Sequence, residues 1–241
     1  IASNYPANVG YYDWVVSGLV TANGKIRIES VDKPSITSTS DAFQTSTIQI
    51  TSPAGNESWQ VGSIKNITWN YGNITNILIF YSTNGTTWSQ IGTGPINAAL
   101  QTYAWTIPDI SSNSVRIKIA DASDTSRNAI SNTFKIGKIT VLYPNGSENL
   151  QSGKSYNITW SSYSSVANVK IEYSTNSGVS WNVITPSVQA SLGTFPWVVT
   201  NITGSSFRIR VSDADAVSPT EFINDISDNN FFVKRLDLIS P

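Results

Sequence analysis

The chain has 241 residues and a net charge of −1, with only 13% charged and 39% hydrophobic residues. This balance excludes a nucleic acid or an anionic membrane as a partner held by charge, and the absence of cysteine excludes a disulfide framework and a thiolate metal site. Eight tryptophans and ten tyrosines are far too many aromatic residues for a disordered chain, so we expect a folded one.

The start of the chain carries no targeting signal that we can identify. The first twenty residues lack a basic leader and a long apolar stretch, so we do not expect a signal peptide. No window approaches 18 apolar residues, so we expect no membrane insertion in this segment. Because the chain contains no methionine, we expect it to be processed or to be part of a longer protein.

Residues 1–46 are expected to be the C-terminal part of a repeat. The segment YYDWVVSGLVTANGKIRIESVDK at 11–33 matches only the rear half of the two units that follow, with Trp14 aligned to Trp105 and Trp197. An internal match of this kind indicates a chain built of repeated structural units.

Residues 47–137 are expected to form one complete Ig-like β-sandwich repeat. Its rear part alternates apolar with basic residues, which is the period-two pattern of a strand with one buried face. The apolar positions are Val115, Ile117 and Ile119, and the basic ones are Arg116 and Lys118.

The phrase YSTNGTTW at 81–88 predicts a tight hairpin, and it recurs as YSTNSGVSW at 173–181. The Tyr of each phrase is expected to end one strand and the Trp to begin its partner, with Asn-Gly or Asn-Ser-Gly supplying positive φ angles between them. The phrase also resembles the Asp-box, Ser-x-Asp-x-Gly-x-Thr-Trp, with Asn in place of Asp. In sialidase propellers the Asp-box is a structural hairpin, so the resemblance implies a turn and not a chemistry.

Residues 138–234 are expected to be a second Ig-like β-sandwich repeat, after a period of about 90 to 100 residues. The segment KITVLYPNGSENLQSGKSYNITWSS at 138–162 matches TIQITSPAGNESWQVGSIKNITWNY at 47–71. Residues 235–241 resemble the opening of each copy and are expected to be the first strand of a further repeat.

These units predict an all-β protein of tandem immunoglobulin-like or fibronectin III-like β-sandwiches arranged end to end. Turn residues interrupt the apolar runs often enough for about seven short strands per unit. Tryptophans that recur in register are best explained by packing. These are the pairs Trp69 and Trp160, Trp88 and Trp181, and Trp105 and Trp197, while Trp59 is replaced by Leu150 and is expected to be a buried anchor.

The order of motifs in each copy is a leading Ile-x-Ile-x-x-Pro, Ile-Thr-Trp, Tyr-Ser, a Trp-Thr-Ile-Pro-like stretch and a closing Phe-x-Ile. It resembles the tandem extracellular β-sandwich repeats of prokaryotic surface proteins, which are similar to the small Ig-like domain of the fungal Ser/Thr-rich GPI-anchored cell-wall family. The Gly-Glu turn of that pattern is here Asn56-Glu57 and Ser147-Glu148. The resemblance implies secretion, a tandem array on a large surface protein, and a spacer or adhesive role.

The sequence predicts no catalytic residues and no cofactor, and we do not expect an enzyme. Without histidine or cysteine, a nucleophilic serine would need a lysine base, and no Gly-x-Ser-x-Gly elbow occurs. The acidic residues lie mostly in loops and do not recur as the matched carboxylate pair that glycoside hydrolysis requires.

A calcium ion is the one metal that the sequence suggests. Asp213, Asp215, Asp225 and Asp228 bracket one loop of the second repeat, and several carboxylates on a loop suit Ca²⁺. The alternative is a solvated turn in which the same carboxylates cap backbone amides.

Two features of the sequence concern glycans. Exposed aromatic residues would bind cell-surface glycans by stacking, although packing explains the recurring tryptophans better. Seven Asn-x-Ser/Thr sequons make N-glycosylation possible, at a frequency that chance alone accounts for. They are Asn56, Asn66, Asn73, Asn84, Asn145, Asn157 and Asn201.

The junctions between units predict the function. Only Gly137 and Lys138 separate the closing strand of one unit from the opening strand of the next, which leaves almost no slack. We therefore expect an extracellular, cell-surface structural segment (a stalk, sheath, fibre or adhesin shaft). Its partners would be neighbouring repeats, or identical chains in a fibre. The alternative is a glycan- or calcium-dependent binding or adhesion module attached to a secreted enzyme.

Overall fold

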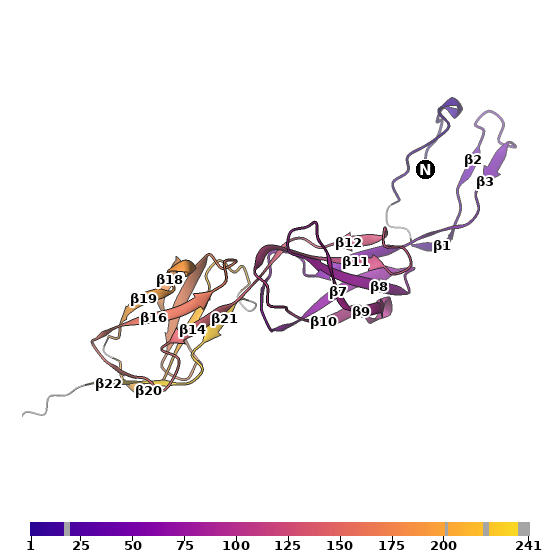
Figure 1. Ribbon diagram of the computed structural model, residues 1–241. Coiled ribbons are helices and arrows are strands. Elements are labelled where there is room, and N and C mark those ends of the chain that lie inside the picture. The colour runs from indigo at the N-terminus through magenta and orange to yellow at the C-terminus, as the bar shows by residue number, and fades with distance from the viewer. Residues whose placement is uncertain (17–19, 201, 219–221, 236–241) are drawn as a thin grey trace, which may run out of the picture.

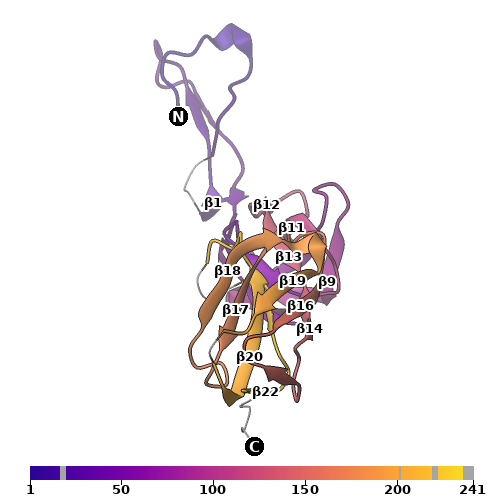
Figure 2. The same ribbon diagram turned by 90° about the vertical axis from the view of Figure 1, so that its left-hand side faces the viewer.

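The computed structural model describes residues 1–16, 20–200, 202–218 and 222–235. Two bodies built of strands lie end to end, and an arm extends from the far end of the first body (Figures 1 and 2). The helical structure in the described residues is limited to single 3₁₀ turns, namely η1 (Ala7–Val9), η2 (Ala98–Leu100) and η3 (Ala190–Leu192).

The first body is a sandwich of two sheets. Its smaller sheet has three antiparallel strands in the order β10-β7-β5: β10 (Thr102–Thr106), β7 (Ile64–Gly72) and β5 (Thr47–Ser52). Its larger sheet has the order β6-β13-β11-β8-β9, with β12 (Asn128–Ile130) beside β11: β6 (Ser58–Gln60), β13 (Phe134–Gly137), β11 (Ser112–Asp121), β8 (Asn76–Ser82) and β9 (Ser89–Asn97). Strand β6 pairs with β13 in parallel, whereas the other pairs are antiparallel.

The second body repeats this order strand for strand. Its smaller sheet is β14-β16-β19: β14 (Ile139–Tyr143), β16 (Ser155–Ser162) and β19 (Thr194–Val198). Its larger sheet is β15-β22-β20-β17-β18, with β21 (Asn224–Ile226) beside β20: β15 (Asn149–Gln151), β22 (Phe231–Lys234), β20 (Gly204–Asp213), β17 (Asn168–Ser174) and β18 (Asn182–Gln189). The predicted all-β class, with tandem Ig-like sandwiches end to end, is confirmed.

Each sandwich has its own hydrophobic core, formed by the inward residues of both sheets. Trp69 and Trp160 are buried at equivalent places, and each indole N–H donates to the carbonyl of an alanine, Ala98 or Ala190, at 2.9 Å. Trp59 is buried as predicted. The repeated sequence therefore builds the same core twice.

Trp88 and Trp181 differ from this expectation. They are half-buried, and each lies just before the edge strand, β9 or β18, instead of beginning it. The Lys118 ammonium lies 4.5 Å from the Trp88 ring, and the Arg210 guanidinium lies 4.4 Å from the Trp181 ring. These tryptophans recur because they cover the cations on the outer face of the larger sheet.

The arm formed by residues 1–46 contains two short strand pairs. Strand β1 (Thr21–Gly24) pairs with β4 (Phe43–Thr45), and β2 (Arg27–Glu29) pairs with β3 (Thr37–Thr39). These pairs correspond to the β11–β13 and β11–β12 pairings of the first sandwich. The predicted boundaries of the four segments stay predictions, and residues 236–241 lie outside the described residues.

Candidate functional site: the joint between the sandwiches

The two sandwiches meet at a joint in which one strand continues almost directly into the next. Strand β13 ends at Gly137, β14 begins at Ile139, and only Lys138 lies between them. The Gly137 carbonyl accepts from the N–H of Val61, and the Lys138 carbonyl accepts from the N–H of Tyr163, so both sandwiches hold the connection. A connection this short and this well bonded does not behave as a flexible linker.

An ion pair joins the two sandwiches at the joint. The Lys135 ammonium lies 2.8 Å from a carboxylate oxygen of Asp213, whose side chain is 0% exposed. A buried carboxylate is costly unless it is paired, so Lys135 stabilises the end of the second sandwich as well as the joint. Beside this pair, the side-chain oxygen of Gln60 accepts from the backbone N–H of Asn224 at 2.9 Å.

Hydroxyl groups form a second set of contacts between the sandwiches. The Tyr163 hydroxyl donates to the carboxylate of Asp109, and this bond raises the pKa of Tyr163 above its ordinary value. The Ser111 hydroxyl lies 3.2 Å from the Ser164 hydroxyl and accepts from the N–H of Ser165 at 3.2 Å. Together with the Lys135–Asp213 pair, these contacts tie the two sandwiches at several points.

A glycine lies at the centre of the joint, where a side chain would be crowded by its neighbours. A Cβ added to Gly137 would lie 2.5 Å from the Ser165 hydroxyl oxygen and 3.1 Å from the Ile223 side chain. The same Ser165 oxygen is buried, and no hydrogen-bond partner for it lies among the described residues. Glycine at position 137 thus permits the close approach, in which the Ser165 oxygen stays without a partner among the described residues.

The four aspartates predicted to bind calcium each accept a hydrogen bond from within the protein. Asp213 pairs with Lys135, Asp225 accepts from the N–H of Val141 at 2.7 Å, and the remaining two accept from asparagine amides: Asp215 from Asn168, and Asp228 from Asn145. Within the described ranges, no three acidic side chains gather as a metal site would require. The calcium site stays a prediction.

The sequons lie mostly on exposed positions. Asn66 and Asn157 are exposed at equivalent places on β7 and β16, and Asn56, Asn73 and Asn84 are also exposed. Asn145 is half-buried and donates to Asp228 at 2.8 Å, while Asn201 lies outside the described residues. Glycosylation stays a prediction.

The predicted hairpins join β8 to β9 and β17 to β18. In the first, the Asn84 side-chain oxygen accepts from the N–H groups of Thr86 and Thr87 at 2.9 Å, and Gly85 has a φ of 78°. A pocket of about 300 Å³ opens beside this turn. It is lined by Tyr81, Ser82, Thr83, Asn84, Thr87, Ser89 and Ile110.

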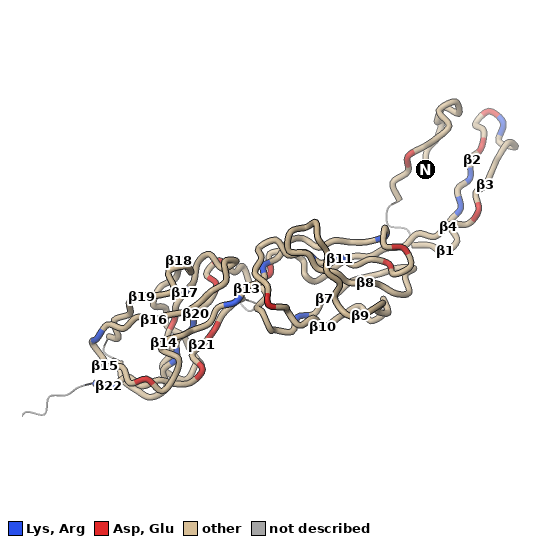
Figure 3. Tube along the Cα trace, viewed as in Figure 1, with Lys and Arg blue, Asp and Glu red and all other residues tan. Residues whose placement is uncertain are grey.

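Charged side chains are distributed unevenly over the strands. Lysine, arginine and acidic residues mark mainly the larger sheets, the loops, the joint and the arm, as Figure 3 shows along the chain. Lys65, near the start of β7, is the exception on the smaller sheets. The outward positions of the smaller sheets are Thr, Ser, Asn, Gln and a few apolar residues. The sandwiches therefore present one nearly charge-free face each.

Sequence reasoning missed the joint residues Lys135, Gln60, Asp109 and Tyr163. It identified the short connection through Gly137 but not the side chains around it. One available signal was a difference between equivalent positions: position 137 is Gly, whereas the positions equally spaced after Phe43 and Phe231 are Ser46 and Lys234.

No protein-family model and no curated protein sequence matches the chain. Among solved structures it is similar to the fibronectin(III)-like modules of Clostridium thermocellum CbhA, at 17% identity over 81% of this chain and 98% of that one, with a TM-score of 0.32. It is also similar to the tandem Ig repeats of Dlar, at 13% identity over 80% of this chain and 100% of that one, with a TM-score of 0.26. A third similar structure is that of the FN1–FN3 domains of chicken CNTN1, at 15% identity over 81% of this chain and 70% of that one, with a TM-score of 0.27.

These likenesses are low in identity and in TM-score, so the assignment of an Ig-like sandwich rests on the strand order of each sheet. No helix in the described parts of the chain is long and apolar enough to span a bilayer.

Proposed function

We propose that the chain is a structural segment of a long extracellular surface protein or filament, a stalk or shaft that holds other parts at a distance. The observation that carries this proposal is the joint. The ends of the two sandwiches are tied by Lys135–Asp213 and Tyr163–Asp109, with one residue between the connecting strands. Units that contact only their neighbours add length without changing the fold of the whole.

The surface supports the same role. The charge-free faces of the smaller sheets carry short hydroxyl and amide side chains, which neither attract ionic partners nor expose a large apolar patch. The edge strands β9 and β18 contain Pro95 and Pro186, which remove backbone donors from an exposed edge and discourage pairing with other strands. Both features suit a segment that stands in solution beside many copies of itself.

An exchange experiment in the full-length protein tests the spacer role. Residues 138–234 are replaced by a second copy of residues 47–137 in which Arg127 is changed to Ile, the residue at the equivalent position 223, so that the copied Asp121 can pair with Lys135. The distance of a distal epitope from the surface of intact cells is then measured by fluorescence localisation. A spacer keeps its reach after the exchange, because only length and fold matter. Loss of surface display, or an epitope that no antibody reaches on intact cells, contradicts the proposal.

A second candidate function is a glycan- or calcium-dependent binding module, and the pocket beside the β8–β9 turn favours it. Its hydroxyl and amide lining, together with the Tyr81 ring, suits a small polar ligand such as a sugar. A glycan screen against the wild type and a Ser89→Leu variant tests the pocket. Thermal melting with and without Ca²⁺ tests the aspartate loop, where a rise of several degrees supports the site and no shift removes it.

A further inference from the structure

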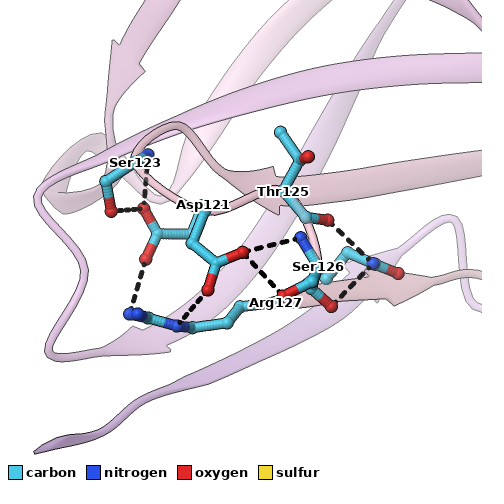
Figure 4. A network of polar contacts seen from close by, with 7 residues as sticks. Asp121, Ser123, Thr125, Ser126 and Arg127 are labelled. Atoms are coloured by element: carbon cyan, nitrogen blue, oxygen red, sulfur yellow. Dashed lines mark hydrogen bonds and ion pairs between the residues drawn. The ribbon is translucent and has the colours of Figure 1, made fainter.

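Each sandwich has an aspartate at the end of one strand, and the cation that pairs with this carboxylate comes from a different place in the two sandwiches. Asp121 and Asp213 end equivalent strands, β11 and β20, and both are nearly buried. In the second sandwich the partner of Asp213 is Lys135 of the preceding sandwich. In the first sandwich the partner of Asp121 is Arg127 of the same sandwich, at 3.3 Å, and Arg127 also pairs with Asp124 at 3.1 Å (Figure 4).

The position of that arginine is occupied by an isoleucine in the second sandwich. The N–H of Asp121 donates to the carbonyl of Arg127, and the N–H of Asp213 donates to the carbonyl of Ile223, so Arg127 and Ile223 are equivalent. Ile223 is 0% exposed and lies against Gly137. An arginine there would fill the place that Lys135 and Gly137 now occupy.

The segments that precede the two sandwiches differ in a corresponding way. Counted from the closing phenylalanine, the positions of Lys135 and Gly137 are occupied by Gln44 and Ser46 before the first sandwich. Gln44 cannot neutralise a buried carboxylate, and the first sandwich supplies its own arginine, Arg127. Lys135 can neutralise the carboxylate of Asp213, and the second sandwich has no arginine at the equivalent position. Each junction thus carries a matched set of residues.

We propose that these positions determine which module docks on which. A sandwich whose strand-end aspartate has no arginine of its own, such as the one with Asp213 and Ile223, accepts a preceding module that ends in Lys-x-Gly. The ion pair that forms across the joint then acts as a lock, holding the two modules in one orientation. A sandwich with an internal arginine, such as Arg127, does not accept that end. The 46/47 junction is of the second kind and lacks the lock. Recognition between modules of this kind does not depend on whether the segment serves as a spacer or as a binding module.

The absence of cysteine allows a direct test. Cysteines replace Thr102 and Thr194, exposed positions on equivalent strands, and spin labels on them report the distance between the sandwiches by double electron–electron resonance. We expect a single narrow distance for the otherwise unchanged chain. Lys135→Gln is expected to lose the narrow peak, and Lys154→Gln, which removes an exposed lysine elsewhere on the second sandwich, is expected to keep it.

A double variant separates the lock from the stability of the second sandwich. Lys135→Gln/Ile223→Arg transplants the internal arginine, so Asp213 regains a cation while the joint loses its lysine. We expect a folded second sandwich by circular dichroism together with a broad distance distribution. Gly137→Ser, which introduces the residue of the other junction, is expected to broaden the distribution independently. A narrow peak in Lys135→Gln, in the double variant or in Gly137→Ser overturns the proposal.

Discussion

At the scale of single residues, Trp160 and Trp181 both recur in the sequence, but the first packs in the core and the second covers a cation on the surface of the sheet. Trp160 is buried and donates to the carbonyl of Ala190, whereas Trp181 lies under the Arg210 guanidinium on the outer face. We expect Trp160→Phe to lower the free energy of unfolding of its sandwich by about 2–4 kcal/mol, through a cavity and a lost hydrogen bond. Trp181→Phe, the matched control, should cost about 1 kcal/mol or less. Urea denaturation followed by circular dichroism measures both, and equal losses contradict this assignment.

The Tyr163–Asp109 bond predicts a pH dependence at the same scale. The pKa of Tyr163 is raised chiefly because its protonated hydroxyl donates to Asp109. Its contribution is complete below the ordinary tyrosine pKa of about 10 and is lost as the pH rises through the higher folded-state pKa. Thermal melts between about pH 8 and 11 should show this loss in the wild type and not in Tyr163→Phe. Identical pH profiles for the two proteins would show that the bond contributes nothing.

At the scale of elements, the β17–β18 hairpin depends on one buried hydroxyl. Ser174 is 0% exposed, and its oxygen accepts from the N–H of Gly178 at 2.8 Å and of Asn176 at 3.2 Å. Ser174→Ala should cost about 1–3 kcal/mol because it leaves these donors unpaired in the turn. Ser187→Ala, at an exposed position of β18, should cost less than about 0.5 kcal/mol. Chemical denaturation measures the free energies of unfolding of the two variants. If these differ by less than about 0.5 kcal/mol, the role assigned to Ser174 is contradicted.

The elements also show what the sequence could and could not predict. The strands, the hairpins and the buried Trp59 follow from local alternation, turn residues and a period that repeats. Trp88 could not be placed, because its partner Lys118 lies on another strand and the sequence carries no sign of which face an aromatic residue next to a turn covers. Local pattern thus identifies each strand but not every contact on its outer face.

At the scale of the whole molecule, the joint shows the same limit. Lys135 and Asp213 are 78 residues apart, and Gln60 and Asn224 are 164 apart, so no periodicity links them. Only the comparison of equivalent positions indicates that one junction differs from the other: Arg127 with Ile223 in the two sandwiches, and Ser46 with Gly137 at the ends of the segments that precede them. Contacts between modules are therefore the part of this protein that required its structure.

If the two sandwiches are held end to end as a stiff unit, small-angle X-ray scattering of the chain should give a pair-distance distribution with one short cross-sectional peak and a long tail. The profile should be reproduced with the two sandwiches kept as one rigid body, whatever positions residues 1–46 adopt. A symmetric distribution of a compact particle, or a profile that requires bent arrangements of the two sandwiches, would contradict this stiffness.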